Sequence, residues 1–322
     1  MKPLTLAELE AAAEEYDAAV AAGDDTDRFC TASHWILSAP GSVSSWGEPW
    51  LRRGAAGWAT ALLRRTAGGV RVVGSLEQMW GFACPLVGPD PERLAQAFGQ
   101  DLALRRREWD VVHLSGLPAD GPLVGALAVA PFHGRLFEVT PGIVRNVASL
   151  RGGLDGYLAR RTRVHRKALR RAERLGREAG VVLEHHRTGD PEALMARIQE
   201  VELRSWKGQQ GVGIEAGRMR EFYTRMLPRL ERAGRLRLVF AQRDDRDLAY
   251  CLGGVFGGTL RGLQQSYDAE QAGLSLGSLC QLHLLRITCM DGDAERYDLG
   301  MDKDYKRHWA ERRVQTVNLL AR

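Results

Sequence analysis

The chain has 322 residues, of which 44% are hydrophobic and 26% charged, and this length suits one large domain or two of ordinary size. No stretch of 18 apolar residues occurs, which argues against a membrane-spanning helix, and the acidic N-terminal stretch argues against a signal peptide. The five cysteines are scattered and odd in number, so a reduced, cytoplasmic protein is expected. No cysteine pair has metal-ligand spacing, and the adjacent His185 and His186 would diverge on a strand, so no metal is expected.

The first part of the chain mixes helical and strand patterns. In order, we expect a helix over 5–22, strands over 57–65 and 70–73, a helix over 91–107, a strand over 109–114, a helical or apolar segment over 121–130 and a strand over 135–140. Glycines cluster over 141–154 and predict a domain boundary there, with one domain over 1–145 and a second over 146–322.

The second part begins with long helical patterns and continues with a strand meander. In order, we expect helices over 157–180, 191–208 and 218–233, strands over 235–242, 248–256 and 260–268, a helix over 277–290, and strands over 295–300 and 314–320. Pro228 is expected to interrupt the third helix. Both parts therefore predict an α+β fold rather than strict βαβ alternation. A helix followed by the strand over 109–114 is faintly echoed by a helix followed by 297–299, which indicates two copies of one domain type or a coincidence.

A Gly/Ser loop opens the helix predicted over 277–290. Successive backbone N–H groups at a helix start, together with the positive end of the helix dipole, form a site for phosphate. Gly277 lets the backbone approach an anion closely, and Ser275 or Ser278 can cap the helix or donate to a phosphate oxygen. A Ser-capped loop without a ligand is the alternative. The candidate anion-binding residues are Ser275, Leu276, Gly277, Ser278 and Leu279.

The same loop matches a second motif. Residues 273–277 read G-x-S-x-G, the nucleophile elbow of α/β-hydrolases, and an acid (Asp298 or Asp302) and His308 follow in the order that such a triad needs. However, only 47 residues follow Ser275, and the strands before it are expected to be antiparallel. The hydrolase is therefore the weaker hypothesis.

The helix predicted over 157–180 is strongly basic. Between residues 160 and 177 it carries nine arginines and lysines against a single acid, Glu173. Like charges on one helix repel each other, so an anionic partner such as coenzyme phosphates, a nucleotide sugar or tRNA is expected, and a solvated face is the alternative. Arg163 and Arg166 are the candidate contacts. Few aromatic residues are interleaved, so base stacking on this helix is not expected.

Two further segments carry candidate binding residues. Trp206 and Lys207 close the helix predicted over 191–208, where they either wall a substrate pocket or belong to the core. Asp302, Tyr305 and Lys306 follow the strand predicted over 295–300. Lys306 and Asp302 either face a pocket at the strand end or are solvated.

The order of three strands, a Gly/Ser loop, a helix and a strand resembles the GNAT acyltransferase fold. More specific features resemble the FemAB-like branch of BioF2-like or CelD-type acetyltransferases, which is similar to the tandem-GNAT Fem aminoacyl transferases of peptidoglycan synthesis. The features are the basic helix, Ser205-Trp206-Lys207, Tyr267-Asp268, Ser275-Leu276-Gly277, Asp298-Leu299-Gly300 and Asp304-Tyr305-Lys306-Arg307-His308-Trp309. The resemblance covers about 157–322 and is weaker across 29–140. It implies tandem GNAT-like domains, each a mixed, mostly antiparallel sheet flanked by helices, with a degenerate first copy.

The resemblance implies transfer of an acyl group from acyl-CoA to an amine of a small molecule, peptide or sugar. The loop over 275–278 would then hold the pyrophosphate of coenzyme A. In GNAT enzymes this loop reads Q/R-x-x-G-x-G/A, and of the equivalent Ala272, Ser275 and Gly277 only the glycine agrees. Fem transferases, which use aminoacyl-tRNA, also have altered loops, so a Fem-type aminoacyl transferase with tRNA on the basic helix is the alternative. A non-catalytic GNAT scaffold is the third hypothesis.

Catalytic roles follow from the chemistry of amide formation. The amine must lose a proton and the developing oxyanion needs a positioned donor. The resemblance implies that two strands part at the reaction centre, here those ending near Tyr267 and Asp298. Asp298 or Asp302 is the candidate base, with Glu202 as a lesser one, and Tyr267 is the candidate acid toward the leaving group. Lys306 would bind an anionic part of the substrate or stabilise charge.

Overall fold

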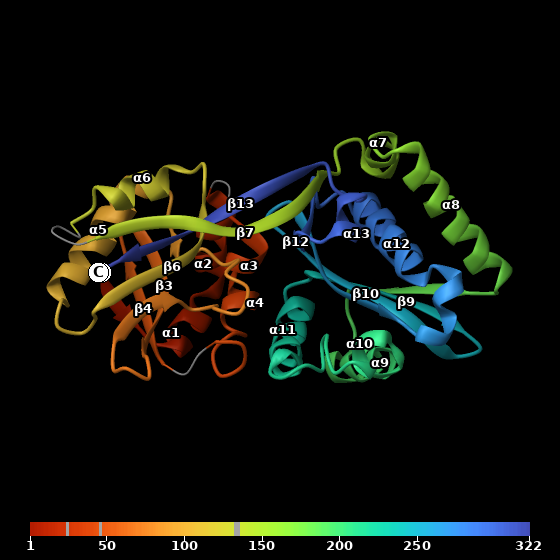
Figure 1. Ribbon diagram of the computed structural model, residues 1–322, viewed down its shortest axis with the longest axis horizontal. Helices are drawn as coiled ribbons and strands as arrows, with labels where there is room; N and C mark the ends of the chain where they lie inside the picture. Colours follow the sequence, from red (N-terminus) through yellow and green to blue (C-terminus); the bar gives the residue numbers. More distant parts are fainter. Residues whose placement is uncertain (24–25, 45–46, 132–135) are drawn as a thin grey trace. The chain divides into compact units, whose positions relative to one another are not determined.

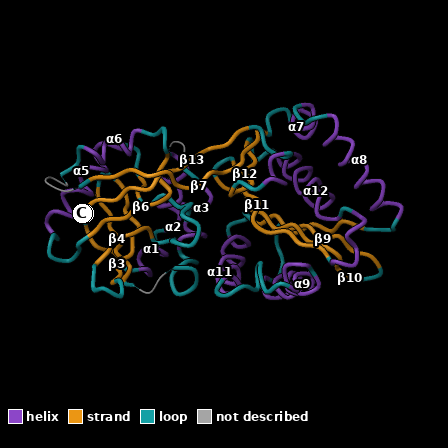
Figure 2. Tube along the Cα trace, viewed as in Figure 1, coloured by secondary structure: helices purple, strands orange, loops and turns teal. Residues whose placement is uncertain are grey.

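The computed structural model describes residues 1–23, 26–44, 47–131 and 136–322. Its contacts divide the chain into two units (Figures 1 and 2). Unit 1 comprises Met1–Val144 and Gln315–Arg322, and unit 2 comprises Arg145–Val314. The last strand of the chain thus belongs with unit 1, whereas the sequence-based division assigned it to the second domain. Arg135, where a strand was expected to begin, lies outside the described residues.

Unit 1 is built on a mixed sheet. Its strands are β1 (Lys2–Leu4), β2 (Glu48–Gly54), β3 (Gly57–Arg65), β4 (Arg71–Ser75), β5 (Leu86–Val87), β6 (Val111–Pro118) and the ends of β7 (Phe137–Ser149) and β13 (Arg312–Ala321) that fall in this unit. The strands from β1 to β4 pair antiparallel in that order, β6 lies parallel to β4, and β13 lies antiparallel to β6. The helices are α1 (Leu6–Ala11), α2 (Ala13–Ala22), α3 (Arg28–Thr31), α4 (Ser33–Ile36), α5 (Pro91–Leu104) and α6 (Pro122–Ala128). The sequence reading missed β2, whose centre buries three successive residues and so lacks the alternation typical of a strand.

The strands of unit 2 likewise pair in a mixed arrangement and carry helices on both faces. Its strands are β8 (Val182–His186), β9 (Leu236–Arg243), β10 (Arg246–Phe256), β11 (Thr259–Tyr267) and β12 (Arg296–Met301). Its helices are α7 (Gly153–Ala159), α8 (Arg163–Glu178), α9 (Pro191–Arg204), α10 (Trp206–Gln209), α11 (Met219–Arg232), the 3-10 helix η1 (Ala269–Leu274), α12 (Leu276–Asp291) and α13 (Asp304–Arg307). The strands from β8 to β11 pair antiparallel, and β12 lies parallel to β11. Figure 1 shows α8 and α12 on one side of this sheet and α9, α10 and α11 on the other.

The two units repeat one succession of elements. In unit 1 it is β2, β3 and β4, then α5, then β6 parallel to β4; in unit 2 it is β9, β10 and β11, then α12, then β12 parallel to β11. In each unit the parallel strand after the helix also pairs with a strand distant from it in sequence: β12 with the end of β7, and β6 with the end of β13. The faint echo in the sequence therefore corresponds to a repeated fold.

The long helices expected from the sequence are shorter in the structure. The helix predicted over 5–22 breaks at Ala12, and the one over 157–180 divides into α7 and α8 because Thr162 is extended and caps α8, its hydroxyl accepting from the N–H of His165. Ser205 likewise ends α9 and caps α10. Pro228, by contrast, lies inside α11 without interrupting it, because the helix buries six of its side chains against the unit.

Close packing holds α8 on α12. The buried side of α8 carries Leu169, Ala172 and Gly176. A Cβ atom at Gly176 would lie 2.5 Å from Cδ2 of Leu279, so glycine allows the two helices to approach this closely. In the described part of the chain, no helix is long and apolar enough to cross a membrane.

Candidate active site

Strands β11 and β12 run side by side for only three residue pairs and then part. Their register ends at Arg261 and Asp298, although β11 continues to Tyr267 and β12 to Met301. A β-bulge on β11 contributes to this, since Leu252 pairs with Gln264 and Gly253 with Gly262. We call residues 262–267 and 299–301 the strand fork. Its backbone groups that would have bonded across the two strands need other partners.

A buried ion cluster closes the base of the strand fork. Asp298 accepts hydrogen bonds from Arg145, from Nη1 of Arg261 at 2.8 Å and from the N–H of Gly300 at 2.7 Å. Burial alone would raise the pKa of this carboxyl group, but the two guanidinium groups and the N–H lower it below its usual value. Gly300 has φ +75, and a Cβ there would approach the Arg261 guanidinium group to 3.2 Å, so glycine suits this turn of β12. The geometry favours a structural role for Asp298 over that of a base.

Two lysines occupy the strand fork. Nζ of Lys207, from α10, donates to the carbonyl oxygen of Gln265 at 2.6 Å, and Nζ of Lys306, from α13, donates to that of Leu299 at 2.7 Å. Each ammonium group therefore binds a carbonyl of one of the two parting strands. Burial lowers the pKa of both lysines, and that of Lys306 falls to about 8 because the Arg261 and Lys207 charges add to the effect.

The start of α12 lies beside the end of β11. Ser275 is left-handed, with φ 57 and ψ 35, and its side chain does not cap the helix. Among the described residues no group accepts from the N–H of Leu276, Gly277 or Ser278. The ring of Tyr267 flanks this turn, since a Cβ at Gly277 would lie 3.5 Å from its Cδ1. Three backbone donors and the helix dipole thus remain available to an anion.

The two other candidate carboxylates are engaged. Asp302 accepts from Nδ2 of Asn146 at 2.8 Å and from Nε and Nη2 of Arg307 at 3.1 and 3.0 Å. These contacts, chiefly that with Arg307, lower its pKa to about 2, which makes it a weak base. Glu202 is fully buried and accepts from the N–H of Ile214 at 3.0 Å and the hydroxyl of Tyr250 at 2.9 Å.

The aromatic candidates near the lysines are partly solvated. Trp206 on α10 is 47% exposed and Tyr305 on α13 is 55% exposed. Nζ of Lys306 lies 5.8 Å from the centre of the Tyr305 ring. The structure thus brings Lys207 and Lys306 together from two distant segments and places one aromatic residue next to each in the sequence.

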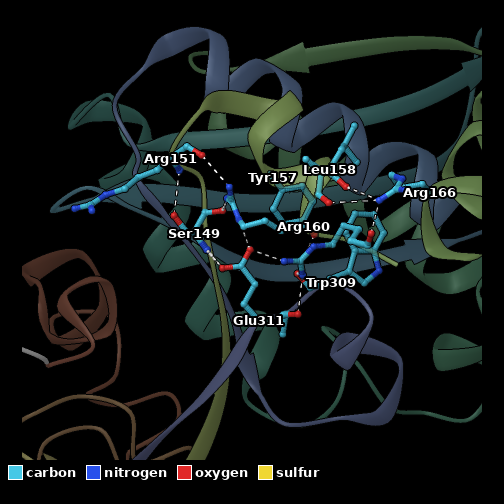
Figure 3. Close-up of polar contacts among 11 residues, drawn as sticks. Ser149, Arg151, Tyr157, Leu158, Arg160, Arg166, Trp309 and Glu311 are labelled. Atoms are coloured by element: carbon cyan, nitrogen blue, oxygen red, sulfur yellow. Dashed lines mark hydrogen bonds and ion pairs between the residues drawn. The ribbon is translucent and has the colours of Figure 1, made fainter. Parts of the chain in front are cut away.

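The basic segment divides into arginines engaged by contacts within unit 2 and exposed cations without an ion-pair partner among the described residues. Figure 3 shows the engaged arginines, among them Arg160 bound to Glu311. Arg161 also binds Glu311 and donates to the carbonyl oxygen of Trp309 at 2.8 Å. Arg166 turns back to the end of α7, where it donates to the carbonyls of residues 158, 159 and 161. The contacts of Arg166 therefore cap α7. The remaining cations, which we call the basic face, are exposed and have no ion-pair partner among the described residues: Arg163, Lys167, Arg170, Arg171 and Arg177.

Sequence reasoning missed several polar residues of this site. Arg145 and Arg261 hold Asp298, and Gln264 and Gln265 lie on β11 beside Lys207. A weak signal for the glutamines was present, because two adjacent amides stand in the strand predicted over 260–268. No local signal pointed to Arg145, which precedes Asp298 by 153 residues.

The hydrolase hypothesis lacks its local structure. A nucleophile elbow needs a strand, a sharp turn and a helix, but the 3-10 helix η1 precedes Ser275. The acid expected for the triad is also closed off by two arginines at Asp298. Over residues 1–23, 26–44, 47–131 and 136–322, no group of His, Cys, Asp or Glu side chains could hold a metal ion.

Comparison with known proteins identifies the fold. Residues 163–307 match the family model of the acetyltransferase (GNAT) domain. The chain superposes on FemX with a TM-score of 0.66 and 12% identity, covering 98% of this chain and 97% of FemX. It also superposes on L-PGS from Bacillus licheniformis (TM-score 0.60, 12% identity, 98% and 92% covered) and on a C-terminal DUF2156 domain from Agrobacterium fabrum (0.64, 12%, 98% and 92%). A search of curated proteins finds no match.

The family match and the parted strands beside a bare helix start define a GNAT acyltransferase domain in unit 2. Residues 163–307 thus belong to the acetyltransferase (GNAT) domain family, and the whole chain shares its fold with FemX. The expected α+β fold of two GNAT-like copies is thereby confirmed.

Proposed function

We propose that unit 2 transfers an acyl group from acyl-CoA to an amine. The observation that carries this proposal is the contrast between two equivalent helix starts. In unit 1, Asp90 caps α5, its carboxylate accepting from the N–H groups of Glu92 at 3.1 Å and Arg93 at 3.0 Å. In unit 2, no side chain caps α12, so the same type of helix start is left for an external anion.

The pyrophosphate of coenzyme A fits the N–H groups of residues 276–278. The adjoining pantetheine would then lead along β11 into the strand fork, with the thioester carbonyl near Lys306 and Lys207. The tight approach of backbone and phosphate explains glycine at position 277. Ser278 adds a hydroxyl donor in the same turn. Arg163 and Arg166 are not needed for this donor.

The reaction requires one bond to form and one to break. The neutral amine of the acceptor attacks the thioester carbon, the C–N bond forms, and the C–S bond breaks. The ammonium group of Lys306 stabilises the oxyanion of the tetrahedral intermediate, because it is positively charged and largely removed from water. Tyr267 gives its proton to the departing thiolate and regains one from the nitrogen of the acceptor. Asp298 and Asp302 act on this site through their arginine contacts and not as bases.

A single substitution tests the donor site. Ser278→Asp places a carboxylate in the first turn of α12, as Asp90 does for α5. We expect it to reduce coenzyme A affinity, measured by isothermal titration calorimetry, by more than about 100-fold through like-charge repulsion. A negative charge at a helix start is at the same time favourable, so the free energy of unfolding should rise by about 0.3–1 kcal/mol.

Ser278→Ala is the matched control and should weaken binding only slightly. Equal binding of coenzyme A by Ser278→Asp and the unaltered protein would contradict the donor site. Absence of coenzyme A binding by the unaltered protein at millimolar concentration would contradict the donor itself.

The basic face favours a second candidate donor, aminoacyl-tRNA. Five exposed cations without ion pairs run along α8, as a phosphate-binding surface would require. Aminoacyl transfer from an ester uses the same carbonyl chemistry at the strand fork. FemX and L-PGS have the same fold at low identity.

Salt dependence separates this donor from the first. For tRNA on the basic face, the affinity should fall steeply with salt, and Lys167→Ala and Arg171→Ala should each reduce the log–log slope by about 1. Arg151→Ala, an exposed cation outside α8 that pairs with Glu295, should leave the slope unchanged. Equal slopes for all three variants would exclude the basic face as the contact.

A further inference from the structure

Unit 1 contains a cavity of about 440 Å³ at the point where its own parallel strands separate. The register of β4 and β6 ends at Gly74 and His113, and both residues line the cavity. Its other walls come from β3, the loop over 78–81, β7 and β13. All of its lining residues belong to unit 1. The volume lies within the range of small-molecule sites, roughly 300–1,000 Å³.

The charge in this cavity is positive and unbalanced. Arg64 lines it, has no ion-pair partner among the described residues, and has a buried Nε without a hydrogen-bond acceptor. Burial and the nearby Arg64 charge lower the pKa of His113, which keeps this imidazole neutral at physiological pH. None of the described lining residues is Asp or Glu. An incompletely compensated guanidinium group in a concave site favours binding of an anion.

The nearest acid in sequence serves another purpose. Glu77 is fully buried, and its carboxylate accepts from the N–H groups of Trp80 at 2.7 Å and Phe82 at 3.1 Å. These bonds fix the loop that carries Met79 and Trp80 into the cavity wall. Glu77 thereby orders the wall and does not line the cavity.

The remaining walls combine hydroxyl and apolar groups. The N–H of Ser115 donates to Oγ of Ser75 at 2.8 Å, and the two hydroxyl groups lie 3.0 Å apart. Ile143 and the side chains of Met79 and Trp80 supply apolar surface. A charged donor at one place and an aromatic and aliphatic wall at another suit a ligand with an anionic group on an apolar body.

We propose that this cavity binds a small organic anion, with a carboxylate or phosphate on Arg64 and an apolar or aromatic body against Met79 and Trp80. The site is independent of the acyl-donor site, because it is formed by unit 1 and shares no residue with the strand fork. The first GNAT copy thus keeps a ligand-binding role without a bare helix start, since Asp90 occupies that of α5.

Three probes of similar size test the proposal on the unaltered full chain. Benzoate and phenyl phosphate carry the two anions, and benzamide is the neutral counterpart of benzoate. Binding is measured by ligand-observed NMR titration, and the site is located by soaking crystals with each probe. We expect millimolar affinity for at least one anion, about tenfold above that for benzamide, because a hydrogen-bonded charge pair is lost with the amide. The preferred anion then distinguishes a carboxylate ligand from a phosphate.

Arg64→Gln should abolish the preference for the anion, while Arg65→Gln should leave it unchanged. Arg65 is the adjacent, exposed residue of β3 and does not line the cavity. The side chain of Arg64 makes no hydrogen bond among the described residues, so Arg64→Gln should fold normally, which circular dichroism checks. Equal binding of benzoate, phenyl phosphate and benzamide by the unaltered protein would overturn the proposal without any substitution. Unchanged anion binding by Arg64→Gln, or density for the probe only outside the cavity, would also overturn it.

Discussion

The two units part their parallel strands in the same way but fill the opening differently. In unit 2 the last register pair is Arg261 and Asp298, an ion pair, and two lysines bind the carbonyls beyond it. In unit 1 the last pair is Gly74 and His113, and a cavity follows. One backbone frame therefore supports a charged, tightly bonded site in one copy and an open one in the other. The two copies differ in the side chains that stand at the end of the register.

The largest expected effect concerns the ion pairs of the two units. Asp298→Ala removes the buried carboxylate that both Arg145 and Arg261 bind, and this should lower the free energy of unfolding by about 3–5 kcal/mol. Hydrogen exchange should locate the loss in β11 and β12. In unit 1, Asp110→Ala removes the partner of the partly exposed Arg71 and should lower the free energy of unfolding far less, because solvent screens this pair. Similar losses for both variants would mean that Asp298 does not hold unit 2 together.

The next prediction separates two roles for Lys306, a charged group that stabilises the oxyanion and a neutral base. If its positive charge stabilises the oxyanion, Lys306→Met should reduce kcat by about 100-fold, and Lys306→Arg should retain more activity. The pKa of about 8 then has a direct consequence, because the charged form is lost as the pH rises through that value. After correction for the neutral fraction of the acceptor amine, the rate of coenzyme A release should be constant below pH 7 and fall above pH 8.

The opposite dependence of the rate on pH would contradict a role of Lys306 in stabilising the oxyanion. A lysine that acts as a base must be neutral, so its rate would rise toward pH 8 and then level off. Lys207→Met is the companion variant, since removing this charge should raise the pKa of Lys306 and shift the profile to higher pH.

The sequence predicted β9, β10 and β11 well because their turns are marked locally, whereas β8, which no such turn joins to its neighbour β9, was missed. Asp244 and Asp245 adopt positive φ between β9 and β10, as turn-forming residues do, and Gly257 and Gly258 do the same between β10 and β11. The break between α7 and α8 was missed because Thr162 interrupts the helix by capping it and not by disrupting its apolar pattern.

The sequence indicated which residues belong to the candidate site, but not which residues they contact. Lys207 and Lys306 were both candidates, yet their approach depends on where β11 and β12 stop pairing, which no local pattern encodes. Asp298 resembled a base because a carboxylate at a strand end is visible in the sequence. Its neutralising Arg145 comes from another part of the chain.

A smaller effect tests the capped helix of unit 1. Asp90→Ala removes the acceptor for two N–H groups of α5 and should lower the free energy of unfolding by about 1 kcal/mol, measured by urea denaturation. Asp190→Ala is a matched control in unit 2, because Asp190-Pro191-Glu192 repeats the sequence Asp90-Pro91-Glu92 and caps α9 in the same way. A loss for Asp190→Ala without one for Asp90→Ala would show that α5 does not depend on its cap, which removes the contrast with α12.

Gly277→Ala has the smallest expected effect on stability, and it distinguishes whether glycine at this position serves the helix or the bound donor. Gly277→Ala adds a Cβ at an ordinary contact distance from Tyr267, and alanine restricts the unfolded chain, so the free energy of unfolding should rise by about 0.5 kcal/mol. The added methyl group lies where a phosphate must approach the backbone, so coenzyme A affinity should fall several-fold in calorimetry. Gly125→Ala, in a helix of unit 1 with open space around it, should raise stability without changing affinity. A more stable Gly277→Ala protein with unchanged affinity would mean that glycine at this position serves the helix and not the ligand.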